Sequence, residues 1–387
     1  MRIGILGGTF NPVHTGHVSM AYFALREFDL DNVYFMVTSD PPHKRVDDDI
    51  SFEHRFNMAK IAAAEAEGVE ASDIEGVRGG ISYTVETLWR LKNESEENVT
   101  LFLIVGADML FDMVNWKNPK RIFDLATIIV VRRDCSNYKL NDEIKKLKQL
   151  YPSCNVDIAE FSVPRISSTE VRNAVKNAKS IAYLVSIPVM EYIYSNGLYV
   201  DDYIRNILFD LKDRLTHKRF LHSISTMNEA MRLADRYGTD TKKARLAGLL
   251  HDCAKISTTD YLSECEEHGI TIDDYERHTP GLLHPKLGAY YAKTRYGVQD
   301  QDILNAIAYH TLCREGMSDL EKIVYLADKI EPKRTYPGVF AIRKAARKSL
   351  NNGVLAAMDF SINCVLIAKK TLHPAITVAR EYILKKI

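Results

Sequence analysis

The sequence predicts a doubly wound parallel α/β domain over residues 1–200 followed by an all-α domain over residues 204–387. Three observations support this prediction. A chain of 387 residues is longer than one ordinary domain, so two domains are the natural expectation. Short apolar runs alternate with helical segments in the first half, which is typical of parallel βαβ units. After Asn196 and Gly197 the alternation stops, and helical periodicity continues almost throughout.

The expected elements of the first domain begin with a buried strand at Arg2–Leu6. Gly7 and Gly8 break this strand, and a helix follows at Val18–Phe28. Further strands are expected at 33–38, 99–105, 126–131 and 155–159, and helices at 52–67, 83–92 and 168–176. The strands end in polar or glycine-rich segments. Because ligands of such sheets bind beyond the carboxyl ends of the strands, we expect a site along that edge.

The second domain is expected to contain helices only. They are predicted near 204–214, 218–237, 240–254, 284–295, 300–310, 318–329, 339–350 and 353–385. No flexible Gly/Ser linker separates the two domains, which predicts close coupling between them.

Composition excludes several classes of function. Lys+Arg and Asp+Glu are both 51, so zero net charge gives no general attraction to nucleic acid or to a membrane surface. No apolar run approaches the ~20 residues of a membrane span. The sequence enters a strand directly, which predicts no signal peptide. The six cysteines are scattered without a CxxC pair, so we expect reduced thiols in a cytoplasmic protein. A homo-oligomer is compatible with all of this.

The loop after the first strand has the features of a phosphate site. Glycines let the backbone come close to an anion, and a helix that starts near Thr15 and Gly16 offers free amides and a favourable dipole. His14 and His17 are three residues apart, so both imidazoles can face this site. The alternative is a tight strand-to-helix turn that carries two surface histidines.

Residues 7–17 resemble the signature of the HxGH nucleotidylyltransferases, which have a Rossmann-like fold. The resemblance implies that His14 and His17 bind the triphosphate of ATP and stabilise charge as pyrophosphate leaves. It is carried by Gly7, Gly8, Thr9, Phe10, Asn11, Pro12, Val13, His14, Thr15, Gly16 and His17.

Later loops resemble motifs of bacterial nicotinate mononucleotide adenylyltransferases, in the same order. The motifs are Pro41-Pro42-His43-Lys44, Ser82-Tyr83-Thr84, Gly106-Ala107-Asp108, Trp116 and Ile166–Arg172. This resemblance implies that nicotinate mononucleotide contacts Lys44, Tyr83, Thr84, Trp116 and Arg133. It implies that ATP contacts the glycine loop, both histidines, Gly106, Asp108, Ser167, Ser168, Thr169 and Arg172. Pantetheine-phosphate adenylyltransferase is the alternative within the superfamily.

The residues themselves agree with these roles. Ser167 to Thr169 precede an amphipathic helix and predict an N-cap, and Arg172 adds a fixed charge one turn later. Asp108 can accept hydrogen bonds from ribose hydroxyls, and Trp116 offers a flat partner for a pyridine ring. No carboxylate cluster is evident in this half, so Mg²⁺ is expected to arrive with ATP.

The helical half contains histidines and aspartates at the ends of apolar segments. Such donors suit zinc, iron or manganese, although a single histidine of this kind is more often structural. The set consists of His222, His251, Asp252, His284, His310 and Asp328.

The order of these residues resembles the HD phosphohydrolase superfamily, and the flanking residues resemble its YqeK-like branch. The resemblance implies one metal held by His222, His251, Asp252 and Asp328. It implies a second metal at His284 and His310 with Asp252 as the bridge, and iron is the first expectation. Asp252 and Lys255 are then catalytic, with Lys255 and Arg334 as phosphate contacts.

The same resemblance implies symmetrical hydrolysis of diadenosine tetraphosphate to two ADP. Two alternatives stay open. The helical domain could be a nucleotide-sensing regulatory module, or it could hydrolyse another nucleotide.

Overall fold

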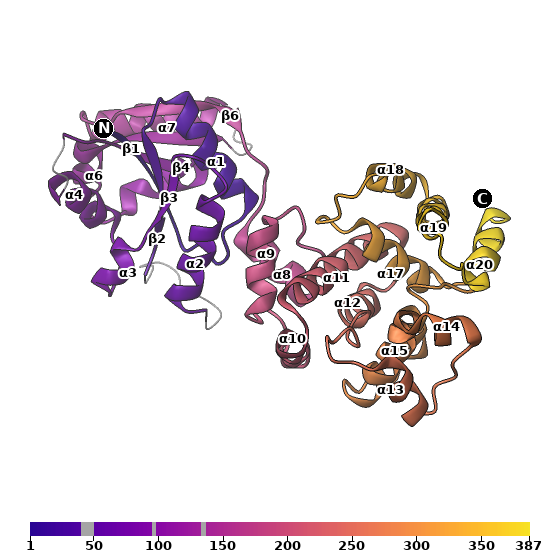
Figure 1. Ribbon diagram of the computed structural model, residues 1–387. Coiled ribbons are helices and arrows are strands. Elements are labelled where there is room, and N and C mark those ends of the chain that lie inside the picture. The colour runs from indigo at the N-terminus through magenta and orange to yellow at the C-terminus, as the bar shows by residue number, and fades with distance from the viewer. Residues whose placement is uncertain (40–49, 95–97, 133–136) are drawn as a thin grey trace. The chain divides into compact units, whose positions relative to one another are not determined.

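The computed structural model describes residues 1–39, 50–94, 98–132 and 137–387, and it divides into two compact units (Figure 1). One unit comprises Met1–Asn173 and Tyr183–Tyr192, and the other comprises Ala174–Ala182 and Ile193–Ile387. The expected domain bounds, 1–200 and 204–387, stay a prediction. Ala174–Ala182 group with the helical residues of the second unit.

The first unit is built on a six-stranded sheet in the order β3-β2-β1-β4-β5-β6, with every adjacent pair parallel. The strands are β1 (Arg2–Gly8), β2 (Asn32–Val37), β3 (Val69–Ser72), β4 (Thr100–Gly106), β5 (Ala126–Arg132) and β6 (Val156–Ser162). The chain reverses its direction of progress across the sheet between β1 and β4. A doubly wound sheet opens a crevice at the carboxyl ends of these two strands.

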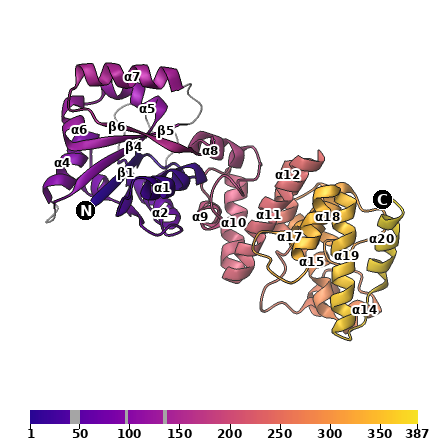
Figure 2. The same ribbon diagram turned by 90° about the horizontal axis from the view of Figure 1, so that it is seen from above.

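Helices cover both faces of this sheet, with α5, α6 and α7 on one side and α1 and α2 on the other (Figure 2). The helices of the first unit and its borders are α1 (Thr15–Glu27), α2 (Phe52–Ala63), α3 (Ile74–Arg78), α4 (Thr84–Glu94), α5 (Ala107–Asp112), α6 (Pro119–Leu125), α7 (Asn137–Leu150), α8 (Ser168–Lys176) and α9 (Ile187–Ser195). Leu101, Leu103 and Val105 alternate along β4 and pack into one core. Because both faces are covered, the central strands are nearly continuous apolar runs.

The second unit is all helical beyond residue 200. Its helices are α10 (Asp202–Arg214), α11 (His217–Tyr237), α12 (Thr241–Leu250), α13 (Tyr261–Glu267), α14 (Asp274–His278), α15 (His284–Thr294), α16 (Gln301–Ala308), α17 (Asp319–Ile330), α18 (Val339–Lys348), α19 (Leu350–Ile367) and α20 (Pro374–Leu384). Helix α11 packs against α12 and α17, and its central residues are almost all buried. The predicted fold class is therefore confirmed for both halves.

The prediction of one continuous helix over residues 353–385 is wrong. The segment 353–385 breaks after Ile367, and α20 begins at Pro374. Lys369 has a left-handed backbone (φ 53°), and a proline at the first helical position cannot continue a preceding helix. The structure also adds strand β3 and helices α3, α5, α6, α7, α9, α13 and α14, which the periodicity did not predict.

Helix α19 is the one described helix that is long and apolar enough to cross a membrane. Its 18 residues have a mean hydropathy of 1.4, and 28% of them are buried. It packs against α17, α18 and α20 within the helical unit. Core helices meet the same criterion, so length and composition are weak indications here.

Candidate active sites

The first candidate site lies at the crevice between β1 and β4. Gly7 and Gly8 end β1, and Gly106 ends β4 and precedes α5. Asp108 lies in the first turn of α5 and is exposed, so its carboxylate is accessible from this edge. The predicted residues of the two loops thus meet at the edge where a doubly wound sheet binds its ligands.

His14 and His17 lie together at the N-terminus of α1. Their rings are stacked with centroids 3.6 Å apart, and the ring of Phe10 meets His17 edge-on at 4.9 Å. The backbone N–H of His14 donates to Nδ1 of His17 at 3.2 Å. A neutral His17 therefore carries its hydrogen on Nε2, where it can donate to an anion.

The start of α8 packs against the β1–α1 loop. Ser168 Oγ donates to the carbonyl of Pro12 at 2.8 Å, and Arg172 Nη1 donates to the carbonyl of Asn11 at 2.7 Å. Ser167 Oγ accepts from the N–H of Glu170 at 3.1 Å, which is the predicted N-cap contact. Two segments about 150 residues apart in sequence thus form one wall.

Gly16 makes this close approach possible. A Cβ at this position would lie 3.1 Å from His14 Nδ1 and 3.3 Å from the carbonyl oxygen of Pro164. These contacts are tighter than ordinary van der Waals distances. A side chain would therefore push the histidines away from the α8 wall.

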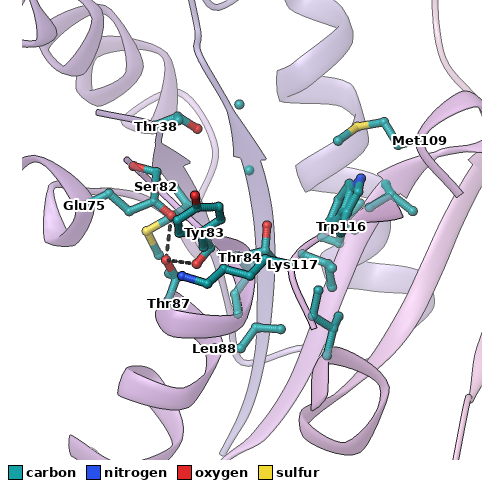
Figure 3. A pocket seen from close by; sticks show the side chains of 18 of the residues that line it. Thr38, Glu75, Ser82, Tyr83, Thr84, Thr87, Leu88, Met109, Trp116 and Lys117 are labelled. Atoms are coloured by element: carbon teal, nitrogen blue, oxygen red, sulfur yellow. Dashed lines mark hydrogen bonds between the residues drawn. The ribbon is translucent and has the colours of Figure 1, made fainter. Parts of the chain in front are cut away.

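A cavity of about 320 Å³ extends from the glycine loop toward α4 and the loop after α5 (Figure 3). Six predicted residues line it: Gly7, Gly8, Thr9, Tyr83, Thr84 and Trp116. Trp116 and Tyr83 come from different elements and both contribute to the wall. The cavity is large enough for a small aromatic nucleotide portion.

The polar residues that complete this cavity were not predicted from the sequence. Thr87 Oγ1 donates to Oε1 of the buried Glu75 at 2.6 Å, and Oε2 of Glu75 has no hydrogen-bond partner. Lys117 Nζ lies 3.7 Å from the centroid of the Tyr83 ring and 2.7 Å from Oε1 of Glu86. The position of Thr87 one turn after the Ser82-Tyr83-Thr84 motif was an available signal. Lys44 and Arg133 lie outside the described residues.

The second candidate site lies in the helical unit, where six predicted residues converge from five places in the chain. His222 lies in α11, His251 and Asp252 follow α12, and Asp328 lies in α17. His284 begins α15, and His310 lies two residues beyond α16. All but His222 are buried, and the side chain of His222 is only 10% exposed.

Each of the four histidines is held through Nδ1. His251, His284 and His310 contact the carbonyl oxygens three residues earlier, at 2.8, 2.6 and 2.7 Å. His222 Nδ1 contacts Oε1 of Glu331 at 3.3 Å. In His251, His284 and His310 the carbonyl places the hydrogen on Nδ1 and leaves the Nε2 lone pair facing the centre, as in metal-bound histidines. His222 differs, because its Nε2 also lies 2.9 Å from a carboxylate oxygen, Oδ1 of Asp328.

Asp252 is the centre of the cluster. Its Oδ2 lies 3.4 Å from His251 Nε2 and 3.9 Å from His222 Nε2. Its Oδ1 lies 3.4 Å from both His284 Nε2 and His310 Nε2. Each oxygen of one carboxylate therefore faces a separate pair of histidines.

Asp328 completes the first of these two groups. Its Oδ1 lies 2.9 Å from His222 Nε2 and 4.0 Å from His251 Nε2. Two donor sets with ligand atoms within 4.8 Å of one another are present, one with His222, His251 and Asp328 and one with His251, Asp252 and His310.

The donor set fits divalent metal. Nε2 of His251 is fully buried without a hydrogen-bond partner, and its lone pair faces a carboxylate. Nε2 of His284 and Nε2 of His310 are 3.1 Å apart with both hydrogens on Nδ1. Two lone pairs that face each other at this distance repel unless a cation lies between them.

The protonation states agree with this fit. Burial lowers the pKa of His284 well below its ordinary value, and it also lowers the pKa of His310. Burial alone would raise the pKa of Asp252, but the neighbouring His251, His310 and Lys255 outweigh it and hold the pKa well below 3.8. Neutral imidazoles such as His284 and His310 beside an ionised carboxylate are the forms that bind metal. At His222 burial would lower the pKa, but the contacts with Asp328 and Glu331 outweigh burial and raise it.

Basic side chains surround the two aspartates. Lys255 Nζ lies 3.1 Å from Oδ1 of Asp252, and Arg334 Nη2 lies 2.7 Å from Oδ1 of Asp328. Both of these were predicted as phosphate contacts. The structure adds Arg219, whose Nη1 lies 2.6 Å from Oδ2 of Asp252.

The structure also adds Lys329 and Glu331. Lys329 Nζ lies 2.8 Å from Oδ2 of Asp328, and Glu331 holds the ring of His222. Lys329 follows Asp328 directly, and Glu331 comes two residues later, in a run rich in charged residues at the end of α17. That run was the available signal, but only the fold brings Glu331 to a histidine 109 positions away.

The fold and the two sites define a class of protein. A doubly wound sheet with paired histidines at the β1–α1 turn is typical of a nucleotidyltransferase, and the helical His/Asp cluster is typical of a metal phosphohydrolase. Residues 5–174 match the Cytidylyltransferase-like family, and residues 219–333 match the HD domain family. An HD domain binds divalent metal, which agrees with the donor set.

Relatives of each half make the assignment more specific. The first half is 38% identical over 215 residues to a probable nicotinate-nucleotide adenylyltransferase of Geobacter sp. (strain M21), covering 52% of this chain and 99% of that one. The second half is 41% identical over 160 residues to a symmetrical bis(5'-nucleosyl)-tetraphosphatase of Bacillus subtilis, covering 41% of this chain and 85% of that one. The chain belongs to the nicotinate-nucleotide adenylyltransferases through its first half and to the symmetrical bis(5'-nucleosyl)-tetraphosphatases through its second.

The same pairing occurs in one relative over nearly the whole length. A probable nicotinate-nucleotide adenylyltransferase/Ap4A hydrolase of Mycoplasma genitalium is 28% identical over 370 residues, covering 94% of this chain and 99% of that one. The order of the two halves is therefore shared with that protein.

Proposed function

We propose that this chain is a bifunctional enzyme that joins adenylyl transfer to nucleotide hydrolysis. The first unit transfers AMP from ATP to nicotinate mononucleotide, giving nicotinate adenine dinucleotide and pyrophosphate. The second hydrolyses diadenosine tetraphosphate symmetrically to two ADP. The observation that carries the proposal is the presence of both sites in one chain: stacked histidines at the β1–β4 crevice, and a six-residue His/Asp cluster around Asp252.

In the first unit, positioning and charge neutralisation carry the reaction. A phosphate oxygen of the mononucleotide attacks the α-phosphorus of ATP, and the bond to the β-phosphate oxygen breaks. His17 donates from Nε2 to the triphosphate, with His14, Arg172 and the amides of α1 beside it. Asp108 accepts from ribose hydroxyls, and Trp116 stacks on the pyridine ring. Mg²⁺ arrives with ATP, since the metal-type donor clusters among the described residues all lie in the helical unit.

Trp116→Ala tests the position of the pyridine ring. We expect about a tenfold or greater rise in KM for nicotinate mononucleotide with little change in KM for ATP, because only the ring loses its stacking partner. Trp89→Ala is the matched control, since Trp89 is the chain's other tryptophan and is 51% exposed on α4. An equal rise in both KM values would contradict the placement.

The same assay tests the choice of substrate. We expect kcat/KM to be far higher for nicotinate mononucleotide than for nicotinamide mononucleotide, because a carboxylate and an amide differ in charge and donor capacity. Equal values for the two substrates would contradict this choice.

In the second unit, the four histidines, Asp252 and Asp328 hold the metal, and Asp252 lies between two groups of donors. When bound, divalent ions act as Lewis acids that activate water and offset phosphate charge. Lys255 and Arg334 hold phosphate oxygens. Iron is our first assignment, with manganese or zinc as alternatives that suit the same donors.

Asp252→Ala and His284→Ala in the full chain test this site. We expect Asp252→Ala to lose hydrolysis and most bound metal, because its two oxygens face both donor groups. His284→Ala should loosen mainly the second ion. His278→Ala is the control, since His278 is exposed on α14.

Metal analysis and chromatography of the products give the outcome. A wild-type chain without metal or hydrolysis would favour a nucleotide-sensing module. ATP plus AMP as products would keep a hydrolase but overturn symmetrical cleavage.

We also propose that the enzyme works in the cytoplasm on small molecules, apart from nucleic acid and membranes. The five described cysteines are free thiols, which supports a reducing compartment. Sedimentation of the purified chain would test for a homo-oligomer.

A further inference from the structure

The His/Asp cluster carries more positive charge than its carboxylates require. Every oxygen of Asp252 and Asp328 is in contact with a different basic side chain. The four are Arg219 and Lys255 at Asp252, and Lys329 and Arg334 at Asp328. Four positive side chains therefore surround these two aspartates. Glu331, whose Oε1 lies 3.6 Å from Arg334 Nε, is the third carboxylate beside them, so the bases still outnumber the acids.

At Asp252, Arg219 and His251 contact the same carboxylate oxygen. Oδ2 of Asp252 lies 2.6 Å from Arg219 Nη1 and 3.4 Å from His251 Nε2. The carboxylate is 1% exposed, whereas the side chain of Arg219 is 34% exposed. An ion beside His251 would need the lone pairs that Arg219 now occupies, and Arg219 can move into solvent to release them.

At Asp328, Lys329 and a histidine contact different oxygens of one carboxylate, and Arg334 shares the oxygen that faces the histidine. Lys329 Nζ lies 2.8 Å from Oδ2, while Oδ1 faces His222 Nε2 at 2.9 Å. The side chain of Lys329 is 24% exposed and the carboxylate is 11% exposed. Here too the base can leave the buried carboxylate at modest cost.

Divalent ions make the excess of positive charge larger. Once ions take the carboxylate oxygens, the released bases and the ions repel one another unless an anion enters. An anion with several phosphate groups offers enough charge and enough acceptor oxygens for both. A molecule with a single phosphate group offers less charge and far fewer acceptor oxygens.

We propose that Arg219 and Lys329 compete with divalent metal for Asp252 and Asp328, and that on release they bind phosphate oxygens of the polyphosphate substrate. This inference rests on the proposed hydrolase activity. Each side chain then has two partners, a carboxylate in the metal-free chain and a phosphate in the loaded one. Removal of either side chain has opposite effects on the affinities for metal and for substrate.

The test uses the full chain with Arg219→Gln and Lys329→Met. In a calorimetric Mn²⁺ titration without nucleotide, each variant is expected to bind roughly tenfold more tightly than wild type, because a competitor for a buried carboxylate is gone. In the presence of Mn²⁺, KM for diadenosine tetraphosphate is expected to rise about tenfold through loss of a charge-assisted contact.

Two further variants serve as controls for Arg219→Gln and Lys329→Met. Lys322→Met removes a lysine from the same helix as Lys329, where it pairs with the exposed Asp319 at 3.0 Å. It should leave both quantities unchanged. Arg219→Lys keeps the charge and should restore an affinity for Mn²⁺ close to wild type, whereas a folding defect would not be rescued in this way.

Weaker or unchanged Mn²⁺ binding in Arg219→Gln and Lys329→Met overturns the competition. When a residue that merely orients a metal ligand is removed, the affinity of the site for metal falls by about 10- to 100-fold. Tighter Mn²⁺ binding with an unchanged KM overturns the phosphate contact. If the wild-type chain cleaves no diadenosine tetraphosphate, the proposed activity fails, while the Mn²⁺ titration and the dissociation constant of the uncleaved nucleotide still decide the inference.

Discussion

In individual histidines of this chain, the hydrogen-bond partner of Nδ1 decides whether Nε2 carries a hydrogen or a lone pair. In His17 a backbone N–H occupies Nδ1, which leaves a hydrogen on Nε2 and makes that side a donor to anions. In His251 a backbone carbonyl occupies Nδ1, which leaves a lone pair on Nε2 that is available to a metal. The same side chain is thus prepared for phosphate in one unit and for a cation in the other.

His17→Ala should lower adenylyl transfer by about 10²–10³, because it removes a donor already aimed at the phosphate site. Hydrolysis of diadenosine tetraphosphate by the same full-length variant should be unchanged. His54→Ala is the control, since His54 lies in α2 and contacts Tyr192. Near-normal transfer by His17→Ala, measured as pyrophosphate release, would contradict the assignment.

At the scale of the helices and strands, the functional groups lie at the ends of these elements. Strands β1 and β4 end at the crevice, and α1 begins there, so that glycines, amides and histidines meet along one edge. In the helical unit, hydrogen bonds near the helix ends connect neighbouring helices. Asp210 of α10 accepts from Arg295 Nε at 3.0 Å and from the hydroxyl of Tyr296 at 2.6 Å, just after α15.

Asp210→Asn should reduce stability in a pH-dependent way. The hydrogen bond from Arg295 holds the pKa of Asp210 below 3.8 in the folded chain. The contribution is therefore present above pH 3.8 and disappears as the pH falls through the lowered pKa. Because the side chain of Arg295 is 48% exposed, solvent screening limits the loss to about 1 kcal/mol.

Thermal unfolding of both chains from pH 7 to pH 3 measures this difference. Asp213→Asn, an exposed change on the same helix, serves as the control and should show no such dependence. A difference between wild type and Asp210→Asn that stays constant down to pH 3 would contradict the role of the ion pair.

At the scale of the whole molecule, the two candidate sites lie in separate units. The His/Asp cluster lies entirely within the helical unit, whereas the crevice residues lie within the sheet unit. Each unit thus contains its own predicted groups, so far as the structure describes them. The two activities are expected to respond separately to the removal of metal.

Chelation of tightly bound metal, followed by restoration of Mg²⁺ alone, should leave adenylyl transfer intact and abolish hydrolysis. Metal that binds only the folded helical unit stabilises it by about 2.7 kcal/mol at a free concentration of 100 Kd. Calorimetry should therefore show a lower unfolding temperature for that unit alone. Equal loss of both activities after Mg²⁺ is restored would contradict separate sites.

The sequence by itself determined the two fold classes and the residues at the ends of the elements. Alternating apolar runs and glycine breaks predict the strands that end at the crevice, because period and chain reversal are local properties. Asp252 and the other cluster residues stand out because each follows an apolar segment, whereas His14 and His17 stand out by their spacing in the glycine loop before a helix. Short or polar elements such as β3 and α7 escaped prediction because their apolar signal is weak.

Tertiary structure decided which distant side chains meet. Arg219 reaches Asp252 across 33 positions, and Glu331 reaches His222 across 109. The pairing of Glu75 with Thr87 in the cavity wall was likewise invisible in the spacing. Contacts of this kind depend on how α11, α12 and α17 pack, and helix packing is set by the shapes of buried faces. Periodicity predicts that a helix has such a face but gives no information about which face it meets.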